Sequence, residues 1–198
     1  TRWSPRAAAW SDYLVVGLAA APATLLAAGP AEDAAGELLT IWGETFLLTT
    51  GVVQLTKALV RRTRPYAYNP DPAIPMNKRL SLTTRRSFPS GHAARAFAMA
   101  VMLSSMYRQM HPGDRAEGWV WGTSLSAAAA VSLLRYLAGY HFPTDVLAGA
   151  AIGAGLGYAV PRWHEKEIAG EWGSQGDPAA NLHAPPAAPL RFGITIRF

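Results

Sequence analysis

Hydrophobic residues recur along most of this chain at the intervals that place them on one face of a helix. In the segment 37–60, Leu39, Trp42 and Phe46 follow one another after three and four residues, as they do on the buried face of an amphipathic helix. Patterns of this kind predict five helices, at about 11–28, 37–60, 90–109, 118–137 and 145–160. Pro161 is expected to end the last helix, because proline removes a backbone donor.

The longest connection between these helices is rich in proline. Residues 64–75 contain four prolines and lead into a basic segment that ends at Arg86, so this stretch is predicted to be a loop. In the last helix, Gly149, Gly153 and Gly157 recur at every fourth position, which predicts close packing against a neighbouring helix. The pattern as a whole predicts an all-α fold, an antiparallel bundle of about five core helices with a functional site at one end.

The end of the chain differs from this helical body. Its composition becomes polar after Pro161, and residues 190–198 alternate apolar and polar side chains, as a strand does. The last stretch is similar to the C-terminal strand of outer-membrane proteins, but one strand cannot close a barrel. We therefore predict one helical domain at 1–165, followed by a polar linker and a short extended tail at 166–198, which serves as an edge strand or a docking tail.

The start of the chain permits two interpretations. Arg2 and Arg6 precede the apolar run 14–28, an arrangement shared with signal peptides. Asp12 is unusual in the charged start of such a peptide, and the run also fits the first helix of the fold, with an interruption at Pro22. We interpret the run as the first helix.

Composition narrows the classes of function. The chain has 198 residues, of which 50% are hydrophobic and 16% charged, and it carries a net charge of +5. A disordered chain would need fewer apolar and more charged residues. The absence of cysteine excludes disulfides, thiol catalysis and thiolate metal sites. The positive charge favours an anionic partner, such as nucleic acid, a membrane surface or a phosphorylated substrate.

Three cations lie at or just beyond the C-terminal ends of predicted helices: Lys57, Arg64 and Arg135. Ser90 and Gly91 open another helix, where free backbone N–H groups and the helix dipole attract anions. In an antiparallel bundle, the ends of the second and fourth helices and the starts of the third and fifth lie on one side. The sequence therefore predicts a phosphate or sulfate site at that side.

Two histidines fall at the same end of the predicted bundle. His141 and Asp145 stand four residues apart across the start of the fifth helix. The carboxylate can accept a hydrogen bond from one imidazole nitrogen, fix the tautomer and leave the other nitrogen nucleophilic. His92, directly after Gly91, would be the general acid that protonates a leaving oxygen.

These residues form three motifs: K-x6-R-P from Lys57, P-S-G-H ending at His92, and R-x5-H-x3-D from Arg135 to Asp145. Their order and spacing resemble the phosphatidic acid phosphatase type 2 superfamily, which includes bacterial non-specific acid phosphatases and vanadium haloperoxidases. The resemblance implies that His141 attacks phosphorus, Asp145 orients it and His92 serves as acid. It also implies that the phosphate is held by Lys57, Arg64, Ser90, Gly91 and Arg135. Leu134 stands where the family usually has serine, so one hydrogen bond near Arg135 is expected to be missing.

The resemblance implies a metal-independent phosphatase that needs no cofactor and works through a phosphohistidine intermediate. Its implied substrates are phosphomonoesters or diphosphates, especially lipid phosphates and polyprenyl diphosphates. One alternative is a vanadium-dependent haloperoxidase with vanadate in the same site, although this chain is much shorter than the typical haloperoxidase. A second is a non-catalytic anion- or lipid-binding protein, against which the complete set of His92, His141 and Asp145 argues.

Other classes of site are disfavoured. The 13 acidic residues form no cluster of the kind that two-metal phosphatases need, so no metal site is expected. No nucleic-acid-binding module is recognisable, so no nucleic-acid partner is expected. The remaining cations near the loop are assigned no catalytic role and are expected to raise the local positive potential: Arg61, Arg62, Lys78, Arg79, Arg85 and Arg86. We interpret three other histidines as surface residues: His111, His164 and His183.

The apolar segments leave the relation to a membrane open. Their uninterrupted runs reach roughly 17 residues, fewer than the about 20 needed to span a bilayer, and Glu44 and Arg95 interrupt two of them. Most cations lie on the side of the site, so the positive-inside tendency would face it to the cytoplasm, whereas most bacterial relatives face the periplasm. We expect a bacterial cell-envelope protein, membrane-associated or integral, with a soluble periplasmic protein as the alternative.

Overall fold

The structure, a computed structural model, describes residues 3–27 and 32–164. It confirms the all-α class, since the described residues contain no strand. The predicted linker and the strand at 190–198 lie outside the described residues. The elements are α1 (Pro5–Ala20), α2 (Ala23–Ala27), α3 (Glu32–Val60), η1 (Pro65–Tyr68), α4 (Met76–Arg79), η2 (Leu82–Arg85), α5 (Gly91–Met110), α6 (Glu117–Leu137) and α7 (Pro143–Trp163).

The observed helices differ from the predicted segments in several places, and α3 for example begins at Glu32 rather than at residue 37. The first segment forms two helices, and α1 begins before residue 11 because Ser4 caps it. The Ser4 Oγ accepts a hydrogen bond from the backbone N of Ala7 at 3.2 Å, and Pro5 fits the first helical position. The predicted end of the last helix at Pro161 was wrong, because α7 continues to Trp163. This proline lies in the final turn, where it removes a single intrahelical donor.

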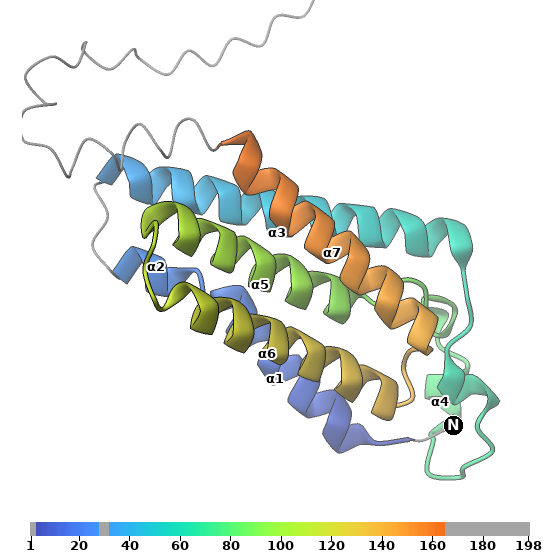
Figure 1. The fold of residues 1–198 in the computed structure, drawn as a ribbon. Helices are drawn as coiled ribbons and strands as arrows, with labels where there is room; N and C mark the ends of the chain where they lie inside the picture. Colours follow the sequence, from blue (N-terminus) through green and yellow to red (C-terminus); the bar gives the residue numbers. More distant parts are fainter. Residues whose placement is uncertain (1–2, 28–31, 165–198) are drawn as a thin grey trace, which may run out of the picture.

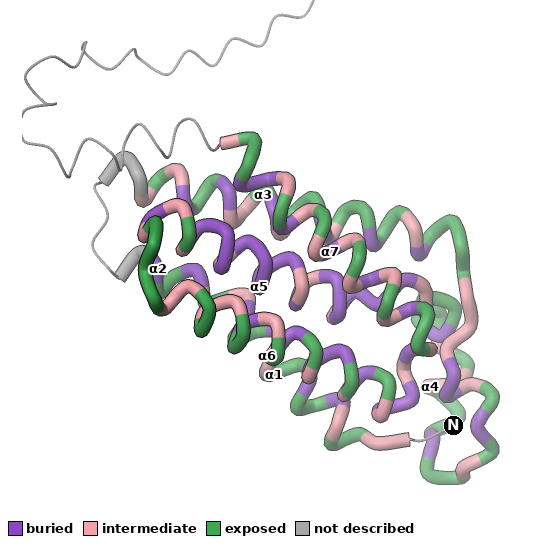
Figure 2. The backbone as a smooth tube through the Cα atoms, in the orientation of Figure 1, coloured by how far each residue is buried: buried purple, intermediate pink, exposed green. Residues whose placement is uncertain are grey.

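The long helices form a bundle around α5 (Figure 1). α5 packs against α7, α6, α3 and α1, and Figure 2 shows it as the most continuously buried element. The chain reverses direction from α3 to α5, from α5 to α6 and from α6 to α7, so the predicted antiparallel order is confirmed. The C-terminal ends of α3 and α6 and the N-terminal ends of α1, α5 and α7 share one end, beside α4 (Figure 1).

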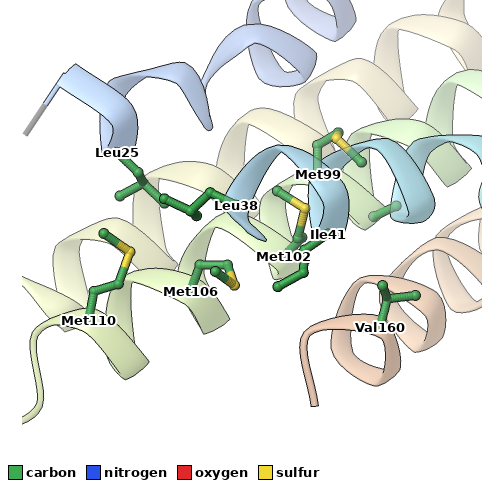
Figure 3. Packing of buried hydrophobic residues seen from close by; sticks show 9 residues of the cluster. Leu25, Leu38, Ile41, Met99, Met102, Met106, Met110 and Val160 are labelled. Atoms are coloured by element: carbon green, nitrogen blue, oxygen red, sulfur yellow. The ribbon is translucent and has the colours of Figure 1, made fainter. Parts of the chain in front are cut away.

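The hydrophobic core at the opposite end is filled largely by methionine (Figure 3). Four methionines of α5 contribute: Met99, Met102, Met106 and Met110. They pack with Leu38 and Ile41 of α3 and Val160 of α7. Unbranched methionine side chains fill irregular spaces between helices. This packing holds α3, α5 and α7 together and so fixes the positions of their far ends.

The close packing predicted for the glycines of α7 is confirmed. A Cβ added at Gly153 would lie 2.8 Å from the carbonyl carbon and 3.0 Å from the Cα of Ala94. Gly149 and Gly157 face Ser90 and Ala98 of α5 in the same way. Only glycine permits this separation, because the obstacle is backbone. The contact aligns the N-terminal ends of α5 and α7.

Candidate active site

The structure brings the sequence-predicted site residues to one end of the bundle. Lys57 is in the last turn of α3, Arg135 is in the last turn of α6, and Asp145 is in the first turn of α7. His92 is the second residue of α5, and His141 lies in the connection between α6 and α7. Two backbone hydrogen bonds join the segments between these helices. Ser90 N donates to Asp145 O at 2.8 Å, and Tyr66 N donates to Gly139 O at 3.1 Å.

His141 and Asp145 face each other in the interior. Their side chains are 2% and 0% exposed, and Nδ1 of His141 lies 3.8 Å from Oδ2 of Asp145. This is longer than a hydrogen bond, and Nδ1 has no hydrogen-bond partner among the described residues. Catalytic hydrogen bonds are often long before substrate binds. The two side chains face each other without a hydrogen bond between them, and the orienting role of Asp145 stays a prediction.

Burial keeps His141 neutral. It lowers the pKa of His141 to about 4, with smaller contributions in the same direction from the cations Arg64 and Lys57, while Asp145 acts in the opposite direction. An imidazole with this pKa carries no proton on its second nitrogen near neutral pH. That nitrogen is therefore free to attack an electrophile.

The Asp145 carboxylate is held from three directions. Its Oδ1 accepts a hydrogen bond from Nη1 of Arg62 at 2.7 Å. Its Oδ2 accepts from Oγ of Ser87 at 2.6 Å and from the backbone N of Phe142 at 2.8 Å. Arg62 also lies over the ring of Phe142, 4.2 Å from its centroid. Sequence reasoning missed Ser87 and assigned Arg62 only a general electrostatic role.

Two of the phosphate-binding candidates are buried cations. Lys57 is 9% exposed and Arg135 is 4% exposed. Among the described residues no carboxylate lies within ion-pair distance of Lys57, and Nε of Arg135 has no hydrogen-bond partner. A buried charge without a counter-ion, such as that of Lys57, is costly, so this end of the bundle favours an anion.

The third cation is held by the loop before α5. Nε of Arg64 donates to the carbonyl of Thr83 at 3.1 Å, and Nη2 donates to the carbonyl of Arg86 at 3.5 Å. The backbone N of Arg64 also donates to the carbonyl of Thr84 at 2.9 Å. These bonds fix the guanidinium at the edge of the site. The predicted loop contains the short helices η1, α4 and η2, and these hydrogen bonds attach it to the site.

The start of α5 differs in detail from the expected anion site. The amide of Ser90 is bonded to Asp145 O, and its Oγ caps the helix by accepting from Ala93 N at 3.4 Å. Gly91 and His92 are the first residues of α5, so their N–H groups have no carbonyl within the helix. A Cβ at Gly91 would lie 3.3 Å from Nζ of Lys57. The backbone donors available to an anion are therefore those of Gly91 and His92, and Ser90 mainly joins α5 to α7.

An unpredicted residue, Asp12 of α1, completes the group around His92. Its Oδ1 lies 2.7 Å from Nε2 of His92. Asp12 also forms an ion pair with Arg135, and the guanidinium of Arg135 contacts Nε2 of His92. Asp12 is the single acidic residue between Thr1 and Ala31, which is the one signal in the sequence that could have indicated it.

The aromatic ring of Tyr140 lies among three cations. Cζ of Arg64 and Cζ of Arg135 lie 5.2 Å and 5.3 Å from its centroid, and Nζ of Lys78 lies 4.6 Å away. Lys78 also contacts the Tyr140 hydroxyl, and Trp3 stacks on the ring at 5.8 Å. Aromatic faces attract cations, so Tyr140 orients guanidinium groups toward the site. No pattern in the sequence indicated this role.

The histidines interpreted as surface residues lie away from this end where the structure describes them. His111 stacks on Tyr107 with centroids 4.6 Å apart, and Nε2 of His164 lies 3.0 Å from Oε2 of Glu44. His183 lies outside the described residues. In the described part of the chain, no group of three or more His, Asp or Glu side chains could hold a metal ion. The absence of a metal from the reaction stays a prediction.

The arrangement can bind a tetrahedral anion and transfer a group to nitrogen. Buried cations and the free amides of α5 lie at the same end of the bundle as the neutral imidazole of His141 and the imidazole of His92. Such a site stabilises the equatorial oxygens of a transferring phosphoryl group.

Comparison with known proteins agrees with this chemistry. The family model described as the PAP2 superfamily matches residues 38–169. A decaprenylphosphoryl-5-phosphoribose phosphatase of Mycobacterium tuberculosis is 36% identical over 109 residues, which are 55% of this chain and 51% of the relative. The bacitracin transport permease protein BcrC of Bacillus licheniformis is 32% identical over 87 residues, which are 43% of this chain and 38% of that protein.

The crystal structure of a transmembrane PAP2-type phosphatidylglycerolphosphate phosphatase from Bacillus subtilis aligns with 79% of this chain and 78% of its own. The identity is 24% and the TM-score 0.49. The chain spans about half the length of the mycobacterial relative that it matches.

Proposed function

The chain belongs to the PAP2 superfamily, and on this basis we propose that it is a metal-independent phosphatase acting through a phosphohistidine intermediate. One observation carries the proposal: a buried, neutral His141 faces Asp145 beside two buried cations, Lys57 and Arg135. A nucleophile next to buried positive charge fits a phosphorylated substrate better than a neutral one.

In the first step, Nε2 of His141 attacks phosphorus. The N–P bond forms as the bond from phosphorus to the leaving oxygen breaks, and the Nδ1 proton moves into a hydrogen bond with Asp145. Lys57, Arg64, Arg135 and the amides of α5 bind the phosphoryl oxygens. His92 donates a proton to the leaving oxygen, which departs as an alcohol or a phosphate.

In the second step, water cleaves the phosphohistidine. His92, now neutral, accepts a proton from the water as its oxygen attacks phosphorus. The N–P bond breaks, phosphate leaves and His141 is restored. The alcohol product leaves before phosphate, which is the order of a ping-pong reaction.

A lipid-linked phosphate is the substrate class that we propose. The name of the mycobacterial relative describes a phosphatase for a decaprenyl-linked sugar phosphate. The loop beside the site also exposes large apolar side chains, with Leu80 77% and Leu82 93% exposed, next to the cations Lys78 and Arg79. Apolar and basic residues together fit a lipid headgroup and the start of its chain.

The outer surface of the bundle supports a place in a bacterial envelope membrane. Within the described residues, one stretch, Ala35–Tyr68, is long and apolar enough to cross a membrane, and 28% of its most apolar window is buried. Its exposed residues include Leu47, Leu55 and Leu59, each more than 60% exposed. Between Val146 and Val160 of α7 there is no charged residue. An apolar outer surface of this kind is expected against lipid, so we propose that the bundle is embedded there with the site near the headgroups.

The test is phosphate release by purified protein in detergent and EDTA. Substrates are a polyprenyl phosphate, a polyprenyl diphosphate, phosphatidic acid and p-nitrophenyl phosphate, and wild type is compared with His141→Ala. We expect EDTA-resistant release that is lost in the variant, and a preference for lipid substrates. A matched control is His111→Ala, which removes a histidine from the opposite end and leaves release unchanged.

Other outcomes select the alternatives. Equal release from wild type and His141→Ala contradicts the phosphohistidine mechanism. Halogenation that depends on vanadate and peroxide, without phosphate release, indicates a haloperoxidase. Lipid phosphate binding that is unchanged by His141→Ala, again without release, indicates a binding protein.

A further inference from the structure

Asp12 lies in the site because α1 packs against the bundle, and it belongs to none of the three sequence motifs. Its helix packs on α5 and α6, with Ala8, Val15 and Leu18 buried against the bundle. This packing places the Asp12 carboxylate 2.7 Å from Nε2 of His92 and in an ion pair with Arg135. The proposed mechanism uses His92 and Arg135 but gives Asp12 no role.

The surroundings of His92 disfavour its protonated form. Burial lowers the pKa of His92, and neighbouring cations lower it further. The other charged or titratable groups that act on it are Arg135 of α6, Arg95 of its own helix, His141 of the α6–α7 connection and Lys57 of α3. The Asp12 carboxylate, 2.7 Å from Nε2, is a contact whose negative charge favours the proton instead. A general acid needs that proton while the bond to the leaving oxygen breaks.

We propose that Asp12 is a positioning residue that makes His92 a general acid. Its Oδ1 accepts a hydrogen bond from the Nε2–H of the imidazolium, so the proton on Nδ1 is the one given to the leaving oxygen of the substrate. When Nδ1 gives up that proton, the imidazole stays in the tautomer that can later accept a proton from water. This inference rests on the proposed function, because it assigns the partner of the acid in that reaction.

Two effects of the carboxylate follow from its contacts. A negative charge beside an imidazolium favours the charged form, and it opposes the cations named above. A hydrogen bond at Nε2 also fixes the ring and decides which nitrogen faces the substrate. The ion pair to Arg135 joins the acid to a phosphate-binding cation, so both groups keep one relative position.

The experiment compares substrates that differ in their need for an acid. An alkyl phosphate has a poor leaving group that must be protonated as it departs, whereas p-nitrophenolate leaves without a proton. kcat and KM for a short alkyl or polyprenyl phosphate and for p-nitrophenyl phosphate are measured for wild type, Asp12→Asn and Asp12→Glu. Asp114→Asn, which removes an exposed carboxylate at the opposite end, is the matched control.

We expect Asp12→Asn to lower kcat for the alkyl phosphate by about 10- to 100-fold, a large part of the usual contribution of a general acid. For p-nitrophenyl phosphate the change is expected to stay within about threefold, because the acid contributes little when the leaving group needs no proton. Asp12→Glu restores part of the lost rate, and Asp114→Asn matches wild type.

The pH profile gives a second readout. The alkyl phosphate reaction requires protonated His92, so its rate falls as pH rises through the pKa of the acid. Removal of the Asp12 charge lowers that pKa, and the alkaline limb of kcat moves to lower pH in Asp12→Asn. A purely structural role of Asp12 would lower the rate without moving this limb.

Several results overturn the inference. An equal loss for both substrates in a folded Asp12→Asn protein, or an unchanged alkaline limb, removes Asp12 from the acid step. A lower KM at unchanged kcat shows instead that the carboxylate competes with phosphate for Arg135. If Asp12→Asn does not fold, the two substrates and the pH profile are compared between wild type and Asp12→Glu instead. A wild-type protein that releases no phosphate contradicts the proposed function itself, whereas all the other outcomes concern Asp12 alone.

Discussion

Gly153 of α7 lies against the backbone of Ala94 of α5 so closely that no side chain fits between them. An added Cβ would stand 2.8 Å from the carbonyl carbon of Ala94. The contact lies between the methionine-rich core and the site, so it fixes the distance from His92 on one helix to Asp145 on the other. Small changes in this separation act directly on the catalytic geometry.

Gly153→Ala is predicted to destabilise the protein. The new methyl group must push two helices apart, which costs about 1–3 kcal/mol in a well-packed interior. The midpoint of thermal unfolding in detergent should fall by several degrees, and phosphatase activity should fall with it. Gly155→Ala is the control, because nothing lies within 4 Å of a Cβ at Gly155. Equal stability of the two variants would contradict the close packing of α5 and α7.

Arg62→Gln is predicted to slow catalysis. The substitution removes the 2.7 Å hydrogen bond to Oδ1 of Asp145 and leaves that carboxylate less firmly oriented. Hydrogen bonds between charged groups contribute about 1.5–3 kcal/mol, so kcat should fall roughly 10- to 100-fold with KM little changed. Arg61→Gln removes the same charge from the exposed neighbouring position and should change kcat less than about twofold. A similar loss in both variants would indicate a general electrostatic role instead.

With p-nitrophenyl phosphate as substrate, kcat/KM is predicted to stay constant from neutral pH down to mildly acidic conditions. The nucleophile must be neutral, and burial lowers the pKa of His141 to about 4. Activity that depends on neutral His141 is therefore lost only as pH falls through about 4. The profile of kcat/KM for p-nitrophenyl phosphate measures this limb, because that substrate depends little on the acid. An acid limb near 6.5, the value of an exposed histidine, would contradict the burial of the nucleophile.

Charged substitutions on the outer face of α3 are predicted to weaken membrane insertion. Leu47 and Leu55 are 69% and 64% exposed, and a lysine in the middle of a bilayer costs about 2.5–3.5 kcal/mol. In cells, Leu47→Lys with Leu55→Lys should shift protein from the carbonate-resistant membrane fraction into the soluble or degraded fraction. Glu44→Gln, on the same helix, should leave the distribution unchanged. Wild type that is fully extracted by carbonate would favour the soluble alternative.

The sequence predicted those parts of the site that depend on local spacing and on the alternation of helix direction. Lys57, His92, Arg135, His141 and Asp145 reach one end because each is near a helix terminus. The antiparallel order then determines which termini meet. Motif spacing also identified the buried pair of His141 and Asp145 before any distance was known.

The parts that could not be predicted depend on packing between distant segments. Asp12 and His92 are 80 residues apart, and no pattern in either helix indicates that they touch. Arg62 and Ser87 flank the loop, and their bonds to Asp145 require the loop to fold back over the site. The end of the last helix was wrongly predicted at Pro161, because the effect of a proline depends on where it lies in a helix. Helix propensity alone does not show that Pro161 lies in the final turn.

The ion pair between Asp12 and Arg135 also has a consequence for the order of synthesis. The two residues are separated by 123 positions, so at ribosomal rates of about 5–20 residues per second roughly 6–25 s pass between them. During that interval α1 carries an acidic side chain whose partner does not yet exist. The pair can close only after α6 has emerged and packed on α1. Activity therefore begins late, when nearly the whole bundle has been made.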